Sequence, residues 1–140
     1  MRYIFLTEQF YTDSAHCTEI EQKQSRPYAQ LLLEINKITF AVPLRSNIHH
    51  KYVLWSDKDN RCGLDFSKAV VIIDMKYIDK TLIPHLRQNE YDALKNKDYF
   101  AKQKLQKYIH DYKRARKYPD KDSSKRILKY SALQYFEEYL

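Results

Sequence analysis

The sequence predicts an α+β fold in which an antiparallel β-sheet of five to six strands is followed by C-terminal helices. Two observations lead to this prediction. The first 85 residues contain short runs of apolar, aromatic and β-branched residues, whereas the last 50 residues space their apolar residues as helices do. A chain of 140 residues has the length of one domain, so we expect a single domain over residues 1–140.

The strand predictions follow the apolar runs along the chain. The first strand is expected at Tyr3–Leu6. The runs Tyr28–Ile35 and Ile38–Leu44 are separated only by Asn36-Lys37, which is typical of a hairpin with a tight turn. Three further strands are expected at Tyr52–Trp55, Ala69–Ile73 and Tyr77–Ile83.

Helical spacing dominates after Glu90. We expect a helix from about Tyr99 to Lys117, which Pro119 ends. A polar loop is expected at Asp120–Lys125, and a last helix near Ser131. The apolar residues that recur at helical intervals are Leu94, Ala101, Leu105, Tyr108, Tyr112 and Ala115.

The composition excludes several classes of protein. Apolar residues make up 44% and charged residues 31% of the chain, which is too apolar for a disordered protein. Gly63 is the only glycine, so the glycine-rich phosphate loops of nucleotide-binding enzymes are excluded. Cys17 and Cys62 lie far apart and outside any CxxC motif, so neither a disulfide framework nor a thiolate zinc site is expected.

The sequence predicts a cytoplasmic protein without a membrane partner. Its longest uncharged apolar run, Ala69–Ile73, is far short of the roughly 20 residues that cross a bilayer. Glu8 interrupts the N-terminal segment before an apolar stretch of signal length develops, which argues against a secretory leader. The two cysteines are therefore expected to be reduced thiols.

Basic and aromatic residues indicate a nucleic-acid partner. Thirteen tyrosines accompany 25 Lys and Arg residues, and the net charge is +7. Flat stacking faces beside positive charge suit single-stranded nucleic acid. Thirteen basic and seven acidic residues follow Glu90, although a solvated helix face also explains such a charge pattern. The densest basic cluster is Lys113, Arg114, Arg116 and Lys117.

The connection that follows the predicted hairpin concentrates reactive side chains. RNA cleavage without a metal needs a base for the ribose 2′-hydroxyl, donors for the phosphate charge and an acid for the leaving 5′-oxygen. Arg45 can clamp a phosphate and Ser46 can donate to a non-bridging oxygen. His49 or His50 titrates in the useful range, and Arg26 can come alongside from the preceding strand.

Each of these residues also has a structural interpretation. An adjacent histidine pair on a loop is often solvated, and two imidazoles without a nearby carboxylate or thiol have too few ligands for a metal. No metal or cofactor is therefore expected. Ser46 is a common turn residue, and no Gly-x-Ser-x-Gly elbow surrounds it as a serine hydrolase would require.

Three segments carry a resemblance to a known family. They are Tyr28–Ile35, Phe40–Ser46 and Cys62–Phe66, the last of which leads into the run Ala69–Ile73. In these segments the chain resembles the ToxN/AbiQ endoribonuclease toxins of type III toxin–antitoxin systems, most closely their TenpN-like branch. The resemblance is concentrated before Pro84.

The resemblance implies a compact, twisted antiparallel sheet with helices, akin to the MazF/Kid-like toxin fold. It implies metal-independent RNA cleavage that leaves 2′,3′-cyclic phosphate and 5′-hydroxyl ends. It also implies an RNA antitoxin of short tandem repeats, which the toxin cuts into units and which holds it inactive in a closed hetero-oligomeric RNA–protein assembly. Released toxin would cut cellular and phage RNA and so abort infection.

The resemblance also implies roles for single residues. Ser46 falls on the family's active-site serine, Arg45 on a threonine and Arg26 on an active-site lysine. Ile48 stands where some relatives have a further lysine. The acid or base is then expected from one of three neighbours, His49, His50 and Lys51.

Two sets of site residues follow from the residues and the resemblance together. Phe10 and Tyr11 align near a groove-lining tyrosine, and Tyr11 is the better base-stacking candidate. The predicted catalytic residues are Arg26, Arg45, Ser46, His49 and His50. The predicted RNA-binding residues are Phe10, Tyr11, Tyr28, Lys51, Trp55, Tyr112, Lys113, Arg114, Arg116 and Lys117.

Two other classes of function remain open at this point. Charge and tyrosines alone justify a non-catalytic RNA- or DNA-binding domain. A protein-interaction domain whose basic helix meets an acidic partner is the third class.

Overall fold

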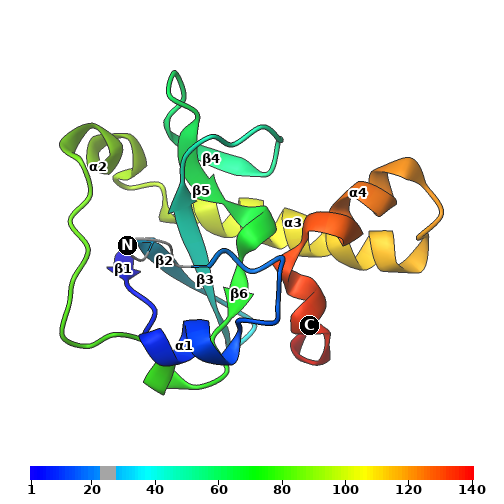
Figure 1. Cartoon of the computed structure of the whole chain (residues 1–140). Helices are drawn as coiled ribbons and strands as arrows, with labels where there is room; N and C mark the ends of the chain where they lie inside the picture. The colour runs from blue at the N-terminus through cyan, green and yellow to red at the C-terminus, as the bar shows by residue number, and fades with distance from the viewer. Residues whose placement is uncertain (23–27) are drawn as a thin grey trace.

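The computed structural model describes residues 1–22 and 28–140 and confirms the α+β class. In this part of the chain six antiparallel strands form one sheet in the order β1-β2-β3-β5-β4, with β6 paired to β3 (Figure 1). The strands are β1 Arg2–Ile4, β2 Gln30–Ile35, β3 Ile38–Arg45, β4 Val53–Asp57, β5 Cys62–Asp65 and β6 Val70–Val71.

The predicted hairpin is confirmed as β2 and β3. Ile35 pairs with Ile38, so the turn holds only Asn36 and Lys37. Both turn residues have positive φ, 50° and 67°, as a type I′ turn requires. This register leaves Arg45 at the end of β3 that lies farthest from the turn.

The central strand β3 links the two halves of the sheet. Phe40 pairs with Val71 of β6, whereas Arg45 pairs with Gly63 of β5. A Cβ on Gly63 would lie 2.5 Å from the carbonyl oxygen of Leu54, so β4 and β5 need a glycine here to approach each other. Arg45 is thereby held beside β5.

The sequence predicted some strands incorrectly. No strand forms over Tyr77–Ile83, where only Ile78 makes an isolated bridge, to Leu6. Asp79 ends the extended segment, because its Oδ1 accepts hydrogen bonds from the backbone N–H groups of Thr81 and Leu82. Conversely, β5 was not predicted, because its four residues include a glycine and a carboxylate.

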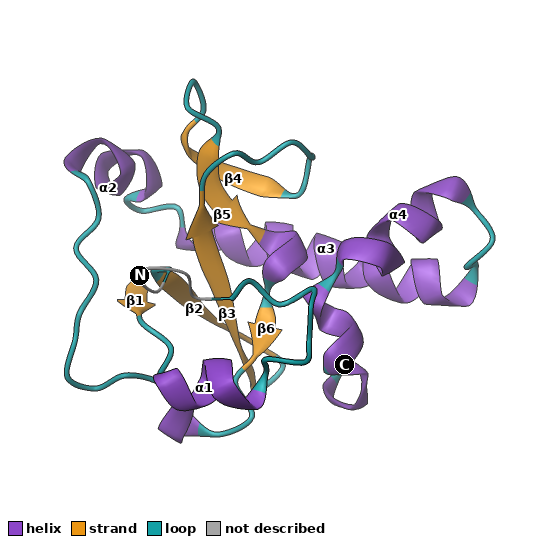
Figure 2. Ribbon diagram, in the orientation of Figure 1, coloured by secondary structure: helices purple, strands orange, loops and turns teal. Residues whose placement is uncertain are grey.

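The long helix is confirmed, and the C-terminal predictions need correction. The helices are α1 Glu8–Asp13, α2 Gln88–Leu94, α3 Asp98–Lys117 and α4 Asp122–Tyr130 (Figure 2). The loop predicted over Asp120–Lys125 is wrong from Asp122 onward, since α4 begins there. Two short 3₁₀ turns, Ala132–Tyr135 and Glu137–Tyr139, replace the last helix, because the backbone at Phe136 leaves the helical region.

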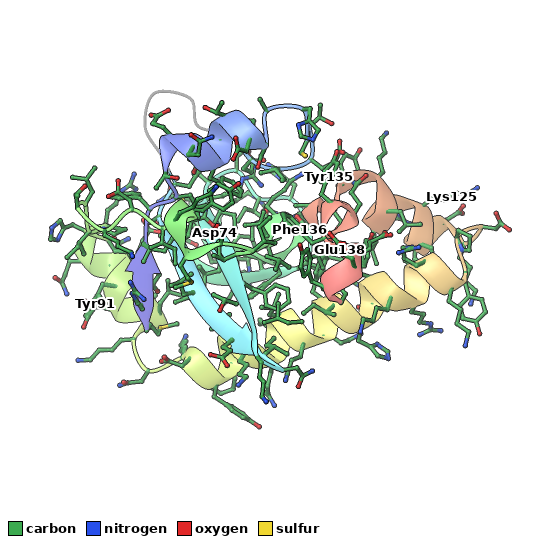
Figure 3. All side chains as sticks on the ribbon, turned by 90° about the horizontal axis from the view of Figure 1, so that it is seen from below. Asp74, Tyr91, Lys125, Tyr135, Phe136 and Glu138 are labelled. Carbon is green, nitrogen blue, oxygen red and sulfur yellow. The ribbon has the colours of Figure 1, made fainter. Side chains whose placement is uncertain are left out.

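The core lies on both faces of the sheet. Figure 3 shows the strands between α1 and α3. The buried residues of α3 are Ala101, Leu105, Tyr108, Tyr112 and Ala115, which repeat the spacing seen in the sequence.

Both cysteines, Cys17 and Cys62, are buried and carry free thiols. Across the helices that the structure describes, none combines the length and the apolar character that a bilayer crossing requires.

Candidate functional site

A cavity of about 670 Å³ opens at the end of β3, between the loop that follows this strand, the 3₁₀ turn η1 (Phe66–Lys68) and the helices α3 and α4. Its charged or ionisable lining residues are Arg45, His49, His50, Lys51, Lys68 and Arg126. The other described lining residues are Tyr52, Ser67, Tyr108, Ser123, Ile127 and Tyr130. Of the lining residues in the described part of the chain, none is Asp or Glu, so the cavity wall is basic.

Ile48 anchors the loop that carries the two histidines. Its side chain is 1% exposed. Its backbone N–H donates to the carbonyl of Arg61 at 3.1 Å, and the Arg61 Nε donates back to the Ile48 carbonyl at 2.8 Å. Asn47, just before it, lies in a bend and has a positive φ of 58°. The anchored loop places His49 and His50 at the cavity.

Asp65 is the buried centre of the charge network behind the cavity. It is 0% exposed and is paired with the guanidinium of Arg45. Glu21 Oε1 lies 3.0 Å from the other Nη atom of Arg45. Arg45 therefore faces the cavity with two carboxylates bound, and a phosphate would have to share or displace the partly exposed Glu21.

His50 is tied into the same network through both ring nitrogens. Its Nε2 lies 3.0 Å from Asp65 Oδ1 and 3.2 Å from Ser67 Oγ. Its Nδ1 accepts the backbone N–H of Tyr52 at 3.0 Å, which assigns the ring proton to Nε2. Asp65 and Ser67 thus meet the same nitrogen, whereas a serine-hydrolase triad needs them on opposite nitrogens.

These contacts explain the ionisation of Asp65. Burial by itself raises the pKa of this carboxyl, but hydrogen bonds from His50 and Ser67 and the charge of Arg45 outweigh burial and lower the pKa below its ordinary value. The Ser67 hydroxyl donates to Asp65 Oδ1 at 2.6 Å, and the Ser67 backbone N–H donates to the same atom at 3.0 Å. Asp65 therefore stays ionised and orients its partners.

Lys68 reaches the cavity from η1. Its Nζ donates to the carbonyl oxygens of Glu19 at 3.1 Å and Tyr130 at 2.9 Å. Burial lowers the pKa of this lysine. The cation thus joins the N-terminal segment, η1 and the end of α4 at one point.

Aromatic side chains form another part of the wall. The rings of Tyr52 and Tyr108 meet edge to face with centroids 4.9 Å apart. Tyr108 is buried, whereas Tyr130 is 53% exposed and has the Nζ of Lys129 5.3 Å from its ring centroid. Tyr130 is therefore the most exposed of the tyrosines in the described lining.

The structure brings most of the predicted catalytic loop together. Arg45, His49, His50 and the predicted RNA-binding residue Lys51 all line the cavity. Ser46 is exposed and does not belong to the described lining. Arg26, the remaining predicted catalytic residue, lies outside the described residues.

Burial corrects the RNA-binding prediction for three aromatic residues. Phe10, Tyr11 and Tyr112 are 3%, 7% and 1% exposed, so their rings pack in the core and present no face to a base. Tyr28 and Trp55 are half-buried and lie outside the described cavity lining.

The basic cluster at the end of α3 forms a separate surface. Lys113, Arg114, Arg116 and Lys117 are all exposed, and Arg116 is paired with Glu137. As far as the described residues go, the cluster contributes no side chain to the cavity.

A search of protein-family models, curated proteins and solved structures finds no match to this chain. The site is therefore interpreted from its own chemistry. Its lining combines cations, imidazoles and a solvent-facing tyrosine, which suits a phosphorylated ligand with a flat base. In residues 1–22 and 28–140, no group of three His, Cys, Asp or Glu side chains is placed to hold a metal ion.

Sequence reasoning missed several residues of the site. Asp65 and Lys68 were the detectable ones, since both interrupt an otherwise apolar stretch between Cys62 and Ile73. Arg126 and Tyr130 carried no such signal, because they lie on a helix that was interpreted partly as a loop. Their distance from Arg45 along the chain hides their proximity in space.

Proposed function

We propose that this chain is an endoribonuclease that cleaves single-stranded RNA without a metal ion, at the cavity described above. The observation that carries the proposal is the lining: Arg45, Lys51, Lys68 and Arg126 supply positive charge beside a 53% exposed tyrosine. A cavity of about 670 Å³ has the size of a small-ligand site and can take a nucleotide.

His49 is the base in this proposal. Its side chain is exposed at the cavity, and its Nε2 lies 2.7 Å from Asn47 Oδ1. Its Nδ1 has no partner among the described residues. His49 removes the proton of the ribose 2′-hydroxyl, the 2′-oxygen bonds to phosphorus, and the bond from phosphorus to the 5′-oxygen breaks. The products are a 2′,3′-cyclic phosphate and a 5′-hydroxyl.

Substrate binding is divided between cations and the aromatic face. Lys51 and Arg126 are exposed and free to meet the phosphates of an extended strand. Tyr130 stacks on a base that is splayed out of helical stacking.

The biological setting follows from the resemblance of the sequence to the ToxN/AbiQ toxins. We propose that the chain is the toxin of a type III system and that a repeat RNA binds and inhibits it. Expression should arrest growth, and co-expression of tandem-repeat RNA encoded just upstream should relieve the arrest. Growth arrest that such RNA leaves unchanged would contradict this assignment.

The enzymatic test uses the purified chain and mixed-sequence RNA in excess EDTA. We expect fragments with 2′,3′-cyclic phosphate and 5′-hydroxyl ends. The His49→Ala variant should lose cleavage while keeping RNA binding, and Lys37→Asn, in the turn at the other end of β3, should retain both. Cleavage that EDTA abolishes would rule out the metal-independent mechanism.

A non-catalytic RNA-binding domain is the second candidate. Two observations favour it: both ring nitrogens of His50 are already bonded within the protein, and Ser46 lies outside the described lining. This candidate predicts salt-sensitive binding to RNA that remains intact.

A further inference from the structure

Lys68 differs from the other cations of the cavity in how its ammonium is held. An ammonium has three N–H donors, and the carbonyl oxygens of Glu19 and Tyr130 accept two of them, at 3.1 and 2.9 Å. The third N–H has no acceptor among the described residues, and Lys68 lines the cavity. One proton of Lys68 is thus left for a ligand.

The two carbonyls fit both protonation states of Lys68. A neutral amine has two N–H groups and one lone pair. After loss of the third proton, both remaining N–H groups keep their carbonyl partners and the lone pair takes the vacated direction. Lys68 can therefore give up and regain a proton without moving.

Charges of both signs surround Lys68 and shift its pKa in opposite directions. Burial lowers its pKa, the carboxylates of Glu21, Asp65 and Glu19 act in the opposite direction, and the guanidinium of Arg45 lowers it further. The net result is a lowered pKa, which makes the ammonium a stronger acid near neutral pH.

We propose that Lys68 is the general acid of the cleavage reaction, an inference that rests on the proposed ribonuclease function. As the 2′-oxygen bonds to phosphorus and the bond to the 5′-oxygen breaks, the third N–H of Lys68 passes its proton to that 5′-oxygen. The electron pair of the broken bond stays on the 5′-oxygen, which leaves as a hydroxyl. Lys68 becomes a neutral amine, and solvent returns its proton.

In the described part of the chain, Lys51 and Arg126 are not held by two carbonyl oxygens as Lys68 is. Lys51 is exposed, and its Nζ lies 5.3 Å from the ring centroid of Tyr52. Arg126 is exposed, and an arginine does not give up a proton near neutral pH. Both residues act as phosphate-binding charges, so they provide matched controls.

The test replaces the leaving oxygen by sulfur. A cleavage site is first mapped with the wild-type chain, and an oligonucleotide with a single ribonucleotide at that site is made with either a 5′-oxygen or a 5′-bridging sulfur. A thiolate leaves without a proton far more readily than an alkoxide does, because thiols are much stronger acids than alcohols. Lys68→Arg keeps the positive charge but removes the acid.

We expect Lys68→Arg to cleave the oxygen substrate at least about 100-fold more slowly than the wild type and the sulfur substrate at nearly the wild-type rate. Arg126→Gln should slow both substrates equally. Equal slowing of both substrates by Lys68→Arg would overturn the acid role while leaving the ribonuclease proposal intact. If the wild-type chain cleaves neither RNA nor these oligonucleotides, the proposed function itself fails and this inference fails with it.

A second measurement needs no variant and so does not depend on the folding of Lys68→Arg. The wild-type rate on the oxygen substrate should fall at high pH as Lys68 loses its proton. The rate on the sulfur substrate should not fall over the same range. Identical pH profiles for the two substrates would also overturn the assignment.

Discussion

The Nε2 of His50 lies 3.0 Å from Oδ1 of the fully buried Asp65, while its Nδ1 accepts the backbone N–H of Tyr52. Both nitrogens of the imidazole are therefore engaged inside the protein. This relationship separates the adjacent histidines into two roles, because His49 is exposed at the cavity and His50 holds the loop against β5. It also makes Asp65 the residue on which the geometry of the basic wall depends.

Replacing Asp65 by asparagine is expected to lower the free energy of unfolding by about 3 kcal/mol at pH 7, because the buried pair with Arg45 loses its negative partner. Urea denaturation measures the loss. Asp59→Asn, an exposed carboxylate in the turn between β4 and β5, should stay within about 0.5 kcal/mol of the wild type. Equal stabilities for the two variants would mean that the network contributes nothing.

The contribution of Asp65 should depend on pH in a defined direction. The pKa of Asp65 is lowered in the folded chain from 3.8, so the carboxylate stabilises the fold above pH 3.8. That stability is lost as the pH falls through the folded pKa. The difference between the wild type and Asp65→Asn should therefore be full at pH 6 and shrink below pH 3.8. A difference that does not change between pH 7 and pH 3 contradicts this linkage.

Replacing His49 should change the cleavage rate, whereas replacing His50 should change the stability of the fold. His49→Ala is expected to reduce the cleavage rate by about 100-fold or more with little change in thermal stability, since its side chain is exposed. His50→Ala should lower the melting temperature, because Asp65 and Ser67 lose a hydrogen-bond partner. Rate measurements and thermal unfolding on both proteins check this. Full cleavage activity in His49→Ala would remove it as the base.

Salt dependence should distinguish the two basic surfaces. If RNA lies across the cavity, Lys51→Gln and Arg126→Gln should each reduce the slope of log affinity against log salt by about 0.7, the value for one phosphate contact on a single strand. Lys37→Asn is the control. Lys113→Gln, in the basic cluster of α3, should also reduce the slope only if the bound RNA extends along that helix.

Variants of two tyrosines should distinguish a residue that stabilises the core from one that binds RNA. Tyr112→Phe removes the hydroxyl that donates to Glu137 and is expected to destabilise the fold by about 1.5–3 kcal/mol. RNA affinity should not change, because that hydroxyl is engaged within the protein. Tyr130→Ala should weaken RNA binding by about 1–3 kcal/mol through lost stacking and leave stability nearly unchanged. Fluorescence anisotropy with a labelled oligoribonucleotide measures both affinities. Unchanged RNA affinity in Tyr130→Ala would place the stacking surface elsewhere.

The parts of the fold predicted correctly are those that local chemistry specifies. Asn36 and Lys37 adopt the positive φ angles of a tight turn, and the flanking strands follow from apolar runs. The apolar stripe of α3 needs only helical periodicity. By contrast, the run Tyr77–Ile83 looks like a strand but finds only one bridging partner, which its own sequence does not reveal.

The candidate site was predictable only where its residues are neighbours in sequence. Arg45 is the last residue of β3, and His49 and His50 lie in the loop that follows it directly, so their composition indicated chemistry. Lys68 and Arg126 join them only because η1 and α4 pack at the end of β3. The exposure of an aromatic ring is also a long-range property, which is why Tyr112 was expected at the interface and lies in the core.

By itself the sequence determined the α+β class, the β2–β3 hairpin and the long basic helix, and it placed Arg45 close to the two histidines in the segment that follows the hairpin. Each of these depends on interactions between residues close along the chain. Only the tertiary structure decided which histidine faces solvent, which tyrosine is open, and that Asp65 and Lys68 belong to the site. The physical reason is that burial and charge pairing arise from contacts between distant segments, and local patterns do not specify those contacts.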